Sequence, residues 1–273
     1  MLNSLRLRFQ LPSVWWLLGL ILLLFSTSAA QATHIRAGDI TAKRDTTPNP
    51  NPRRFFFTMV IYRDTSPGSA EMESEPEIFD GLVFRKVRVA SVVPIGNDTE
   101  KHTFRWETTF PADGTYTASW TGINRNNNIL NLSAPSDQHS FYIQTTININ
   151  SLRGFNSTPV LTVDPIDLGM VGRKFVHNPG AFDADGDSLA FKFVTPRRRD
   201  PMGNIITVPG FQMPHLLFGC QNSLGTGPAT FTLDPLTGQL EWDAPCRRGE
   251  YNIAFVVEEW RVSPGGGAVK LGE

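Results

Sequence analysis

Apolar and polar residues alternate with a period of two along most of the chain beyond residue 33. The clearest run is Phe141 to Ile149, where every second residue is apolar or Thr and the residues between are mostly polar. Such alternation is typical of a half-buried β-strand. In the run Phe55 to Tyr62 both alternating sets are largely apolar, which predicts a central strand covered on both faces.

The same pattern predicts further strands over Leu82–Val93, Thr103–Phe110, Thr115–Trp120, Ala190–Val194, Thr230–Leu233, Gln239–Trp242 and Tyr251–Val257. The segments 111–114 (PADG) and 234–238 (DPLTG) are short enough to close hairpins, and 263–267 (SPGGG) is predicted as another hairpin loop. No long helical period is present. Many short strands separated by turn residues predict an all-β fold built of sandwiches.

A polar segment with Gly and Pro, residues 153–159, follows the Phe141–Ile149 strand and predicts a domain boundary. We therefore expect two Ig-like β-sandwich domains in tandem, over residues 33–155 and 156–273, each of about 120 residues. Residues 269–273 read as a strand that is only beginning. We expect the second domain to be truncated and the sequence to be a fragment of a longer protein.

The N-terminal segment has a different pattern. Two arginines precede an apolar run from Val14 to Phe25, and small residues follow it. This order predicts a secretory signal peptide over residues 1–32, cleaved between Ala32 and Thr33. The apolar run is shorter than the roughly 20 residues that a spanning helix requires. We expect no membrane span after cleavage.

Export changes how the two cysteines, Cys220 and Cys246, are interpreted. An oxidising compartment permits a disulfide between them, and two buried free thiols are the alternative. The formal net charge is −1, and the only basic cluster is Arg197–Arg199, interpreted as a solvated loop. We therefore expect no nucleic-acid partner.

The densest group of polar residues is the run Asp183-Ala184-Asp185-Gly186-Asp187. Three carboxylates so close together repel one another unless water or a hard cation offsets their charge. Ca²⁺ takes roughly six to eight oxygen ligands and suits alternate Asp side chains on an irregular loop. We expect the three Asp residues to bind Ca²⁺, with further ligands from Asn156 or Glu258. An acidic turn closed by its own hydrogen bonds is the alternative.

The chain shows no assembled catalytic site. The five His residues are scattered, and neither an H-E-x-x-H nor a G-x-S-x-G motif is present. Glu258 and Glu259 are adjacent on a predicted strand, so their side chains should point to opposite faces. We expect no enzymatic activity. Core packing is the expected role of three tryptophans on alternating strands: Trp106, Trp120 and Trp242.

Eight motifs, in this order, carry a resemblance to known proteins: 32–40 (ATHIRAGDI), 62–64 (YRD), 124–126 (NRN), 156–160 (NSTPV), 177–189 (HNPGAFDADGDSL), 234–238 (DPLTG), 242–245 (WDAP) and 249–255 (GEYNIAF). Together they resemble the N-terminal part of large Bacteroidetes cell-surface proteins. Those proteins often end in a gliding-motility-associated, type IX secretion (type B) sorting domain, which this sequence does not contain. Residues 110–117 (FPADGTYT) resemble the signature of PKD domains. The second half resembles cadherin-like, Ig-type modules.

This resemblance implies a secreted protein on the bacterial cell surface, at the exterior of the outer membrane, with a structural or adhesive role in adhesion or gliding motility. It implies partners among other surface proteins or polysaccharides. It also implies Ca²⁺ binding by Asp183, Asp185 and Asp187 at a domain junction. The alternative function is that of a carbohydrate-binding module in an exported polysaccharide-binding protein, for which Trp260 is a candidate contact.

Overall fold

The computed structural model describes residues 34–262 and 265–273. By its internal contacts the chain from Ala32 to Glu273 forms one compact unit. The predicted signal peptide and its cleavage site, Ala32 and Thr33, lie outside the described residues. The described chain is all-β, as predicted, with two short 3₁₀ helices at Ser136–Gln138 and Pro214–Leu216. Among its described helices, none has the length and apolar character needed to cross a bilayer.

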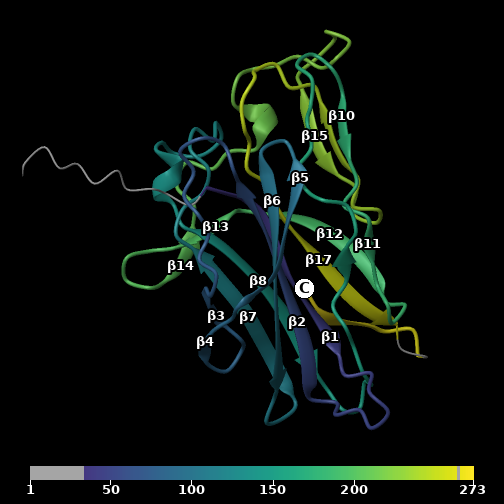
Figure 1. The fold of residues 1–273 in the computed structure, drawn as a ribbon. Coiled ribbons are helices and arrows are strands. Elements are labelled where there is room, and N and C mark those ends of the chain that lie inside the picture. Colours follow the sequence, from purple (N-terminus) through teal and green to yellow (C-terminus); the bar gives the residue numbers. More distant parts are fainter. Residues whose placement is uncertain (1–33, 263–264) are drawn as a thin grey trace, which may run out of the picture. The chain divides into compact units, whose positions relative to one another are not determined.

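Four antiparallel strands form the first sheet, in the order β1-β2-β6-β5 (Figure 1). Their bounds are β1 Ile35–Arg44, β2 Arg54–Asp64, β5 Val89–Gly96 and β6 Thr99–Thr109. The predicted central strand is β2, which pairs with β1 on one side and β6 on the other. Phe57, Met59 and Ile61 of this strand are fully buried, while Phe56 and Val60 on its other face are half-buried.

A seven-stranded antiparallel sheet follows the order β12-β17-β18-β8-β7-β3-β4. Its strands are β3 Glu77–Phe79, β4 Phe84–Lys86, β7 Gly114–Gly122, β8 Phe141–Ile149, β12 Ser188–Val194, β17 Ala254–Val262 and β18 Ala268–Gly272. Strands from both predicted domains belong to this sheet, because β18 pairs with β8 where Gly272 faces Ile147. The ranges 33–155 and 156–273 are therefore joined by strand pairing, and their division into two Ig-like sandwiches stays a prediction.

Three smaller sheets complete the fold. One contains β10 Phe175–His177, β15 Thr230–Leu233 and β16 Leu240–Asp243. The second pairs β9 Val160–Leu161 with β11 Ala181–Phe182, and the third pairs β13 Arg197–Arg199 with β14 Ile205–Thr207. The arginine run, expected in a solvated loop, forms β13 instead. Its side chains have specific acceptors: Arg199 Nε donates to Thr121 Oγ1 at 3.1 Å, and Arg197 Nη1 donates to Gln144 Oε1 at 3.2 Å.

Two main hydrophobic cores hold the sheets together. The larger one lies between the four-stranded sheet and the β3, β7 and β8 part of the seven-stranded sheet, and Phe57 stacks there on Trp106 at 5.1 Å between ring centroids. The smaller core contains Phe231, Leu240 and Trp242. The three tryptophans predicted in the core are all buried. Burying each large apolar side chain contributes roughly 1.5–3 kcal/mol, so these cores are the main source of stability.

Two local predictions were wrong, both where the chain passes from one sheet to another. The strand predicted at Leu82–Val93 divides into β4 and β5, which belong to different sheets, and Val87 between them is buried in the larger core. The turn at 111–114 closes no hairpin, because β6 and β7 also lie in different sheets. Phe110 turns this corner, with its ring buried and its N–H donating to Arg53 O at 2.9 Å.

The hairpin predicted at 234–238 is confirmed, since β15 and β16 pair with Leu233 opposite Leu240. Asp234 Oδ1 closes the turn by accepting hydrogen bonds from the N–H groups of Leu236 and Thr237 at 2.9 and 2.8 Å. Gly238 has φ +71°, and a Cβ there would meet the Phe191 ring at 2.4 Å. Glycine is thus required both by the backbone angle and by the close packing.

Candidate metal centre

The run Asp183–Asp187, called the acidic loop from here on, connects β11 to β12. Asp183 Oδ1 accepts hydrogen bonds from the N–H groups of Asp185 at 2.9 Å and of Asp187 at 2.8 Å. This closes the loop on itself, and Gly186 supports it with φ +81°. The loop therefore holds its three carboxylates in fixed and different directions.

The structure brings two of the three predicted ligands together with a residue that the sequence did not single out. Carboxylate oxygens of Asp183, Asp187 and Glu259 all lie within 4.8 Å of one another. Glu259 is on β17 and is 0 % exposed. Its Oε1 atom and Asp183 Oδ2 are buried and receive no hydrogen bond from any other described group, and a protonated Glu259 donates its proton to Asp183. Two buried carboxylates that face each other are costly unless a proton or a cation lies between them.

The other carboxylate oxygen of Glu259, Oε2, accepts a hydrogen bond from Asn156 Nδ2 at 3.0 Å, which fixes the side chain. Burial, with a contribution from the neighbouring Asp183, raises the pKa of Glu259 to about 9. Without a cation the side chain is therefore protonated at neutral pH. Asn156, one of the two further ligands considered from the sequence, contacts the cluster in this way. The other, Glu258, instead receives a hydrogen bond from Lys270 Nζ at 2.8 Å.

Arg261 lies two residues after Glu259 on β17, and two of its guanidinium nitrogens bind Asp187. Arg261 Nε donates to Asp187 Oδ1 at 2.7 Å, and Nη2 donates to Oδ2. The hydrogen bond to Asp187 raises the pKa of Arg261. The same guanidinium donates to the backbone carbonyls of Arg153 at 2.9 Å and Phe155 at 3.2 Å, and to Asn156 Oδ1 at 3.0 Å.

Asp185, the third predicted ligand, lies outside this group of carboxylates. Its Oδ1 accepts a hydrogen bond from Arg44 Nε at 2.9 Å, and its Oδ2 accepts one from the Ser157 N–H at 2.7 Å. Arg44 is the last residue of β1. Asp185 therefore connects the acidic loop to the first sheet.

Residues 153–159, called the junction segment from here on, were expected to be a polar boundary between domains. In the structure Asn156, Ser157 and Thr158 are buried. The Thr158 N–H donates to Ala42 O at 2.8 Å, and the Ala42 N–H donates to Thr158 Oγ1 at 2.7 Å. The junction segment is thus bonded to β1 on one side and to the acidic loop on the other.

The donor set fits a hard divalent cation. All candidate ligands are carboxylate oxygens, the type that Ca²⁺ prefers. Two guanidiniums, Arg44 and Arg261, face four acids: the three Asp residues of the acidic loop and Glu259. When Glu259 is ionised the group carries two uncompensated negative charges, which one divalent cation would neutralise. The unpartnered Glu259 Oε1 and Asp183 Oδ2 would hold the ion together with Asp187.

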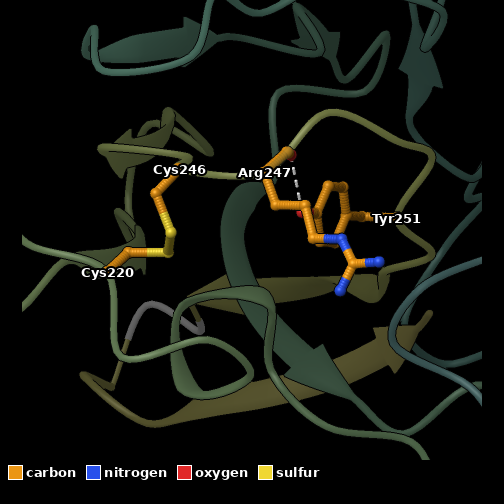
Figure 2. The surroundings of a disulfide bond; sticks show 4 residues. All are labelled: Cys220, Cys246, Arg247 and Tyr251. Carbon is orange, nitrogen blue, oxygen red and sulfur yellow. Dashed lines mark hydrogen bonds between the residues drawn. A yellow bond between two sulfur atoms is a disulfide. The ribbon is translucent and has the colours of Figure 1, made fainter.

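A disulfide joins Cys220 to Cys246, the pairing that the sequence left open beside two free thiols. Their Cα atoms are 5.5 Å apart, and Cys220 is buried. Figure 2 shows that Tyr251 lies close by, with its hydroxyl donating to Arg247 O at 2.8 Å. The disulfide joins the loop before β15 to the segment after β16.

Comparisons with known proteins return no match: no family model, no curated protein and no solved structure is significantly similar to this chain.

Proposed function

We propose that this chain is part of an exported structural or adhesive protein of the bacterial cell surface. Its β-sandwich modules hold a fixed relative position because Ca²⁺ binds at the acidic loop. Asp183, Asp187 and Glu259 are the carboxylate ligands, and Asp185 fastens the loop to β1. The chain acts as a rigid spacer or contact module and catalyses no reaction. Its partners are other surface proteins or surface polysaccharide.

One observation carries this proposal. The acidic loop contacts β1 through Arg44, the junction segment through Ser157, and β17 through Arg261 and Glu259. A cation there would reduce the repulsion among three acids of the second predicted half, and the same loop is bonded to the first half through Asp185 and Arg44. Its binding energy would then oppose any movement of one half against the other.

Two further features support a modular protein outside the cytoplasm. A structural disulfide is characteristic of oxidising compartments. Each predicted half also contains a tyrosine whose hydroxyl donates to the carbonyl four residues upstream: Tyr116 to Ala112 at 2.9 Å and Tyr251 to Arg247 at 2.8 Å. This tyrosine corner is characteristic of Greek-key sandwiches.

A thermal unfolding experiment with and without Ca²⁺ tests the proposal. The chain from Thr33 to Glu273 should gain melting temperature as Ca²⁺ is added. A concentration a hundredfold above Kd contributes about 2.7 kcal/mol, which corresponds to roughly 5–10 °C for a chain of this size. Asp183→Asn and Glu259→Gln should each lose most of this gain, because each removes a ligand charge and keeps the side-chain shape.

The matched control is Glu73→Gln, which removes an exposed carboxylate that has no ion pair among the described residues. It should respond to Ca²⁺ as the unmodified protein does. Both cluster variants should remain folded without Ca²⁺, since an amide oxygen can still accept the hydrogen bonds made at Asp183 and Glu259. If the melting temperature ignores Ca²⁺, or if Glu259→Gln keeps the full gain, the cation does not bind at this cluster.

A further inference from the structure

A cavity of about 620 Å³ lies away from the acidic cluster, between β1 of the first sheet and strands β8, β12 and β17 of the seven-stranded sheet. It exists because β18 pairs with β8 only at Ile147 and with β17 only from Glu259 onward. The remaining ends of β8 and β17, residues 141–145 and 254–258, both line the cavity. Its volume lies within the range of small-molecule sites, roughly 300–1,000 Å³.

The side chain of Asp39 on β1 is an acidic group of this cavity without a partner in the protein. It makes no hydrogen bond or ion pair with any described residue, although it is not exposed. The neighbouring Lys101, whose charge acts on Asp39, already binds Asp164 at 2.7 Å. Tyr62, whose hydroxyl donates to the same Asp164 at 2.7 Å, contributes an aromatic ring to the wall. This half-buried carboxylate has no donor in the protein and is therefore free to accept hydrogen bonds from a bound ligand.

Hydrogen-bond donors come from other strands that line the cavity. Lys192 on β12 is exposed and has no ion-pair partner among the described residues. Arg197 and Tyr142 both donate to Gln144 Oε1, at 3.2 and 3.0 Å, and therefore form a connected polar wall. Most of the other lining side chains are aliphatic or aromatic. The cavity thus combines apolar walls with acceptors and donors in separate places.

These features select against charged ligands. An anion would meet Asp39, whose carboxylate has no cation of its own. A cation would meet Lys192 and Arg197, which have no ion pair among the described residues. Lys270, which also lines the cavity, is already paired with Glu258 and Glu273, and Arg36 is paired with Asp64. A neutral ligand with several hydroxyl groups avoids both conflicts, because each hydroxyl can donate to a carboxylate and accept from an ammonium or guanidinium. Its C–H faces would pack on the apolar walls and tyrosine rings.

We propose that this cavity binds a neutral mono- or disaccharide, with Asp39 accepting hydrogen bonds from the sugar hydroxyls and Lys192, Arg197 and Tyr142 binding its other polar groups. This site is separate from the acidic cluster, and either site can exist without the other.

The test uses the chain from Thr33 to Glu273 and a panel of neutral α- and β-linked disaccharides of glucose, galactose, mannose and xylose. Saturation-transfer NMR identifies binders, and calorimetric titration gives Kd. At least one sugar should bind saturably. Asp39→Asn should weaken that binding about tenfold, because a charge-assisted hydrogen bond becomes a neutral one. Asp98→Asn, in an exposed turn, should leave Kd unchanged.

The second variant, Asp39→Ala, removes the carboxylate acceptor completely and should bind no sugar. Its melting temperature should stay within a few degrees of that of the unmodified chain. The proposal is overturned if no sugar in the panel binds, or if Asp39→Asn binds as tightly as the unmodified chain. Choline serves as a cationic probe, and choline binding in place of sugar would overturn the ligand class. The outcome is independent of Ca²⁺, so its failure would leave the calcium proposal unaffected.

Discussion

Asp39 and Glu259 show how much depends on single side chains. Both are acidic residues on strands; Glu259 is fully buried and Asp39 is half-buried. Neither could be recognised from the sequence as a candidate binding residue. Alternation shows that a residue faces inward, but it does not show what it meets there. The three acids of the acidic loop were recognisable because adjacent like charges require compensation locally.

The stability of the protein should depend on pH through Asp39. Burial raises its pKa from 3.8 to about 6, and the nearby Asp164 adds to this while Lys101 opposes it. The folded state therefore holds the proton more tightly than the unfolded state. The resulting stabilisation is complete below pH 3.8 and is lost as the pH rises through 6. The shift corresponds to at most about 3 kcal/mol, and water in the cavity reduces this figure.

Urea unfolding at pH 4 and pH 7 measures this effect in the unmodified chain and in Asp39→Asn. The difference in unfolding free energy between the two proteins should change by roughly 1–3 kcal/mol across this interval, with Asp39→Asn relatively more stable at pH 7. Taking the difference cancels the contribution of Glu259, whose raised pKa acts in the same direction. An unchanged difference would mean that the Asp39 carboxylate is well hydrated in the folded protein.

At the scale of elements, the sequence predicted strands more reliably than their partners. The Phe141–Ile149 strand is observed with the predicted bounds, because its alternation reflects one buried face. The segment Leu82–Val93 has the same alternation, but the chain changes sheets at Val87 in its middle. Local patterning contains no information about which sheet a strand joins. The β1 strand, which carries Asp39 and Arg44, was not predicted at all.

The two tyrosine corners offer a matched test of equivalent elements. Tyr116→Phe and Tyr251→Phe each remove one hydroxyl and the hydrogen bond to the carbonyl four residues upstream. Each change should lower the free energy of unfolding by about 1 kcal/mol, and the double variant by the sum. Chemical denaturation of the three variants measures this. A loss confined to one tyrosine would contradict equivalent structural roles in the two halves.

At the scale of the whole molecule, the junction segment was correctly located but incorrectly characterised. Its Gly, Pro and polar residues suggested an exposed linker, whereas Asn156, Ser157 and Thr158 are buried and bonded on both sides. Contacts such as Arg44 with Asp185 connect positions 141 residues apart. They arise only when the complete chain is folded, which is why the sequence predicted Asp183 and Asp187 as ligands but could not place Glu259 beside them.

We propose above all that a divalent cation binds at the acidic loop, beside the junction segment, with Glu259 as a ligand. Calorimetric titration of Ca²⁺ into the chain from Thr33 to Glu273, after removal of bound metal with a chelator, tests it most directly. The account predicts one Ca²⁺ bound per chain and at least tenfold weaker binding in Glu259→Gln, with Glu73→Gln unchanged. Absence of binding heat, or equal affinity in Glu259→Gln, would contradict it.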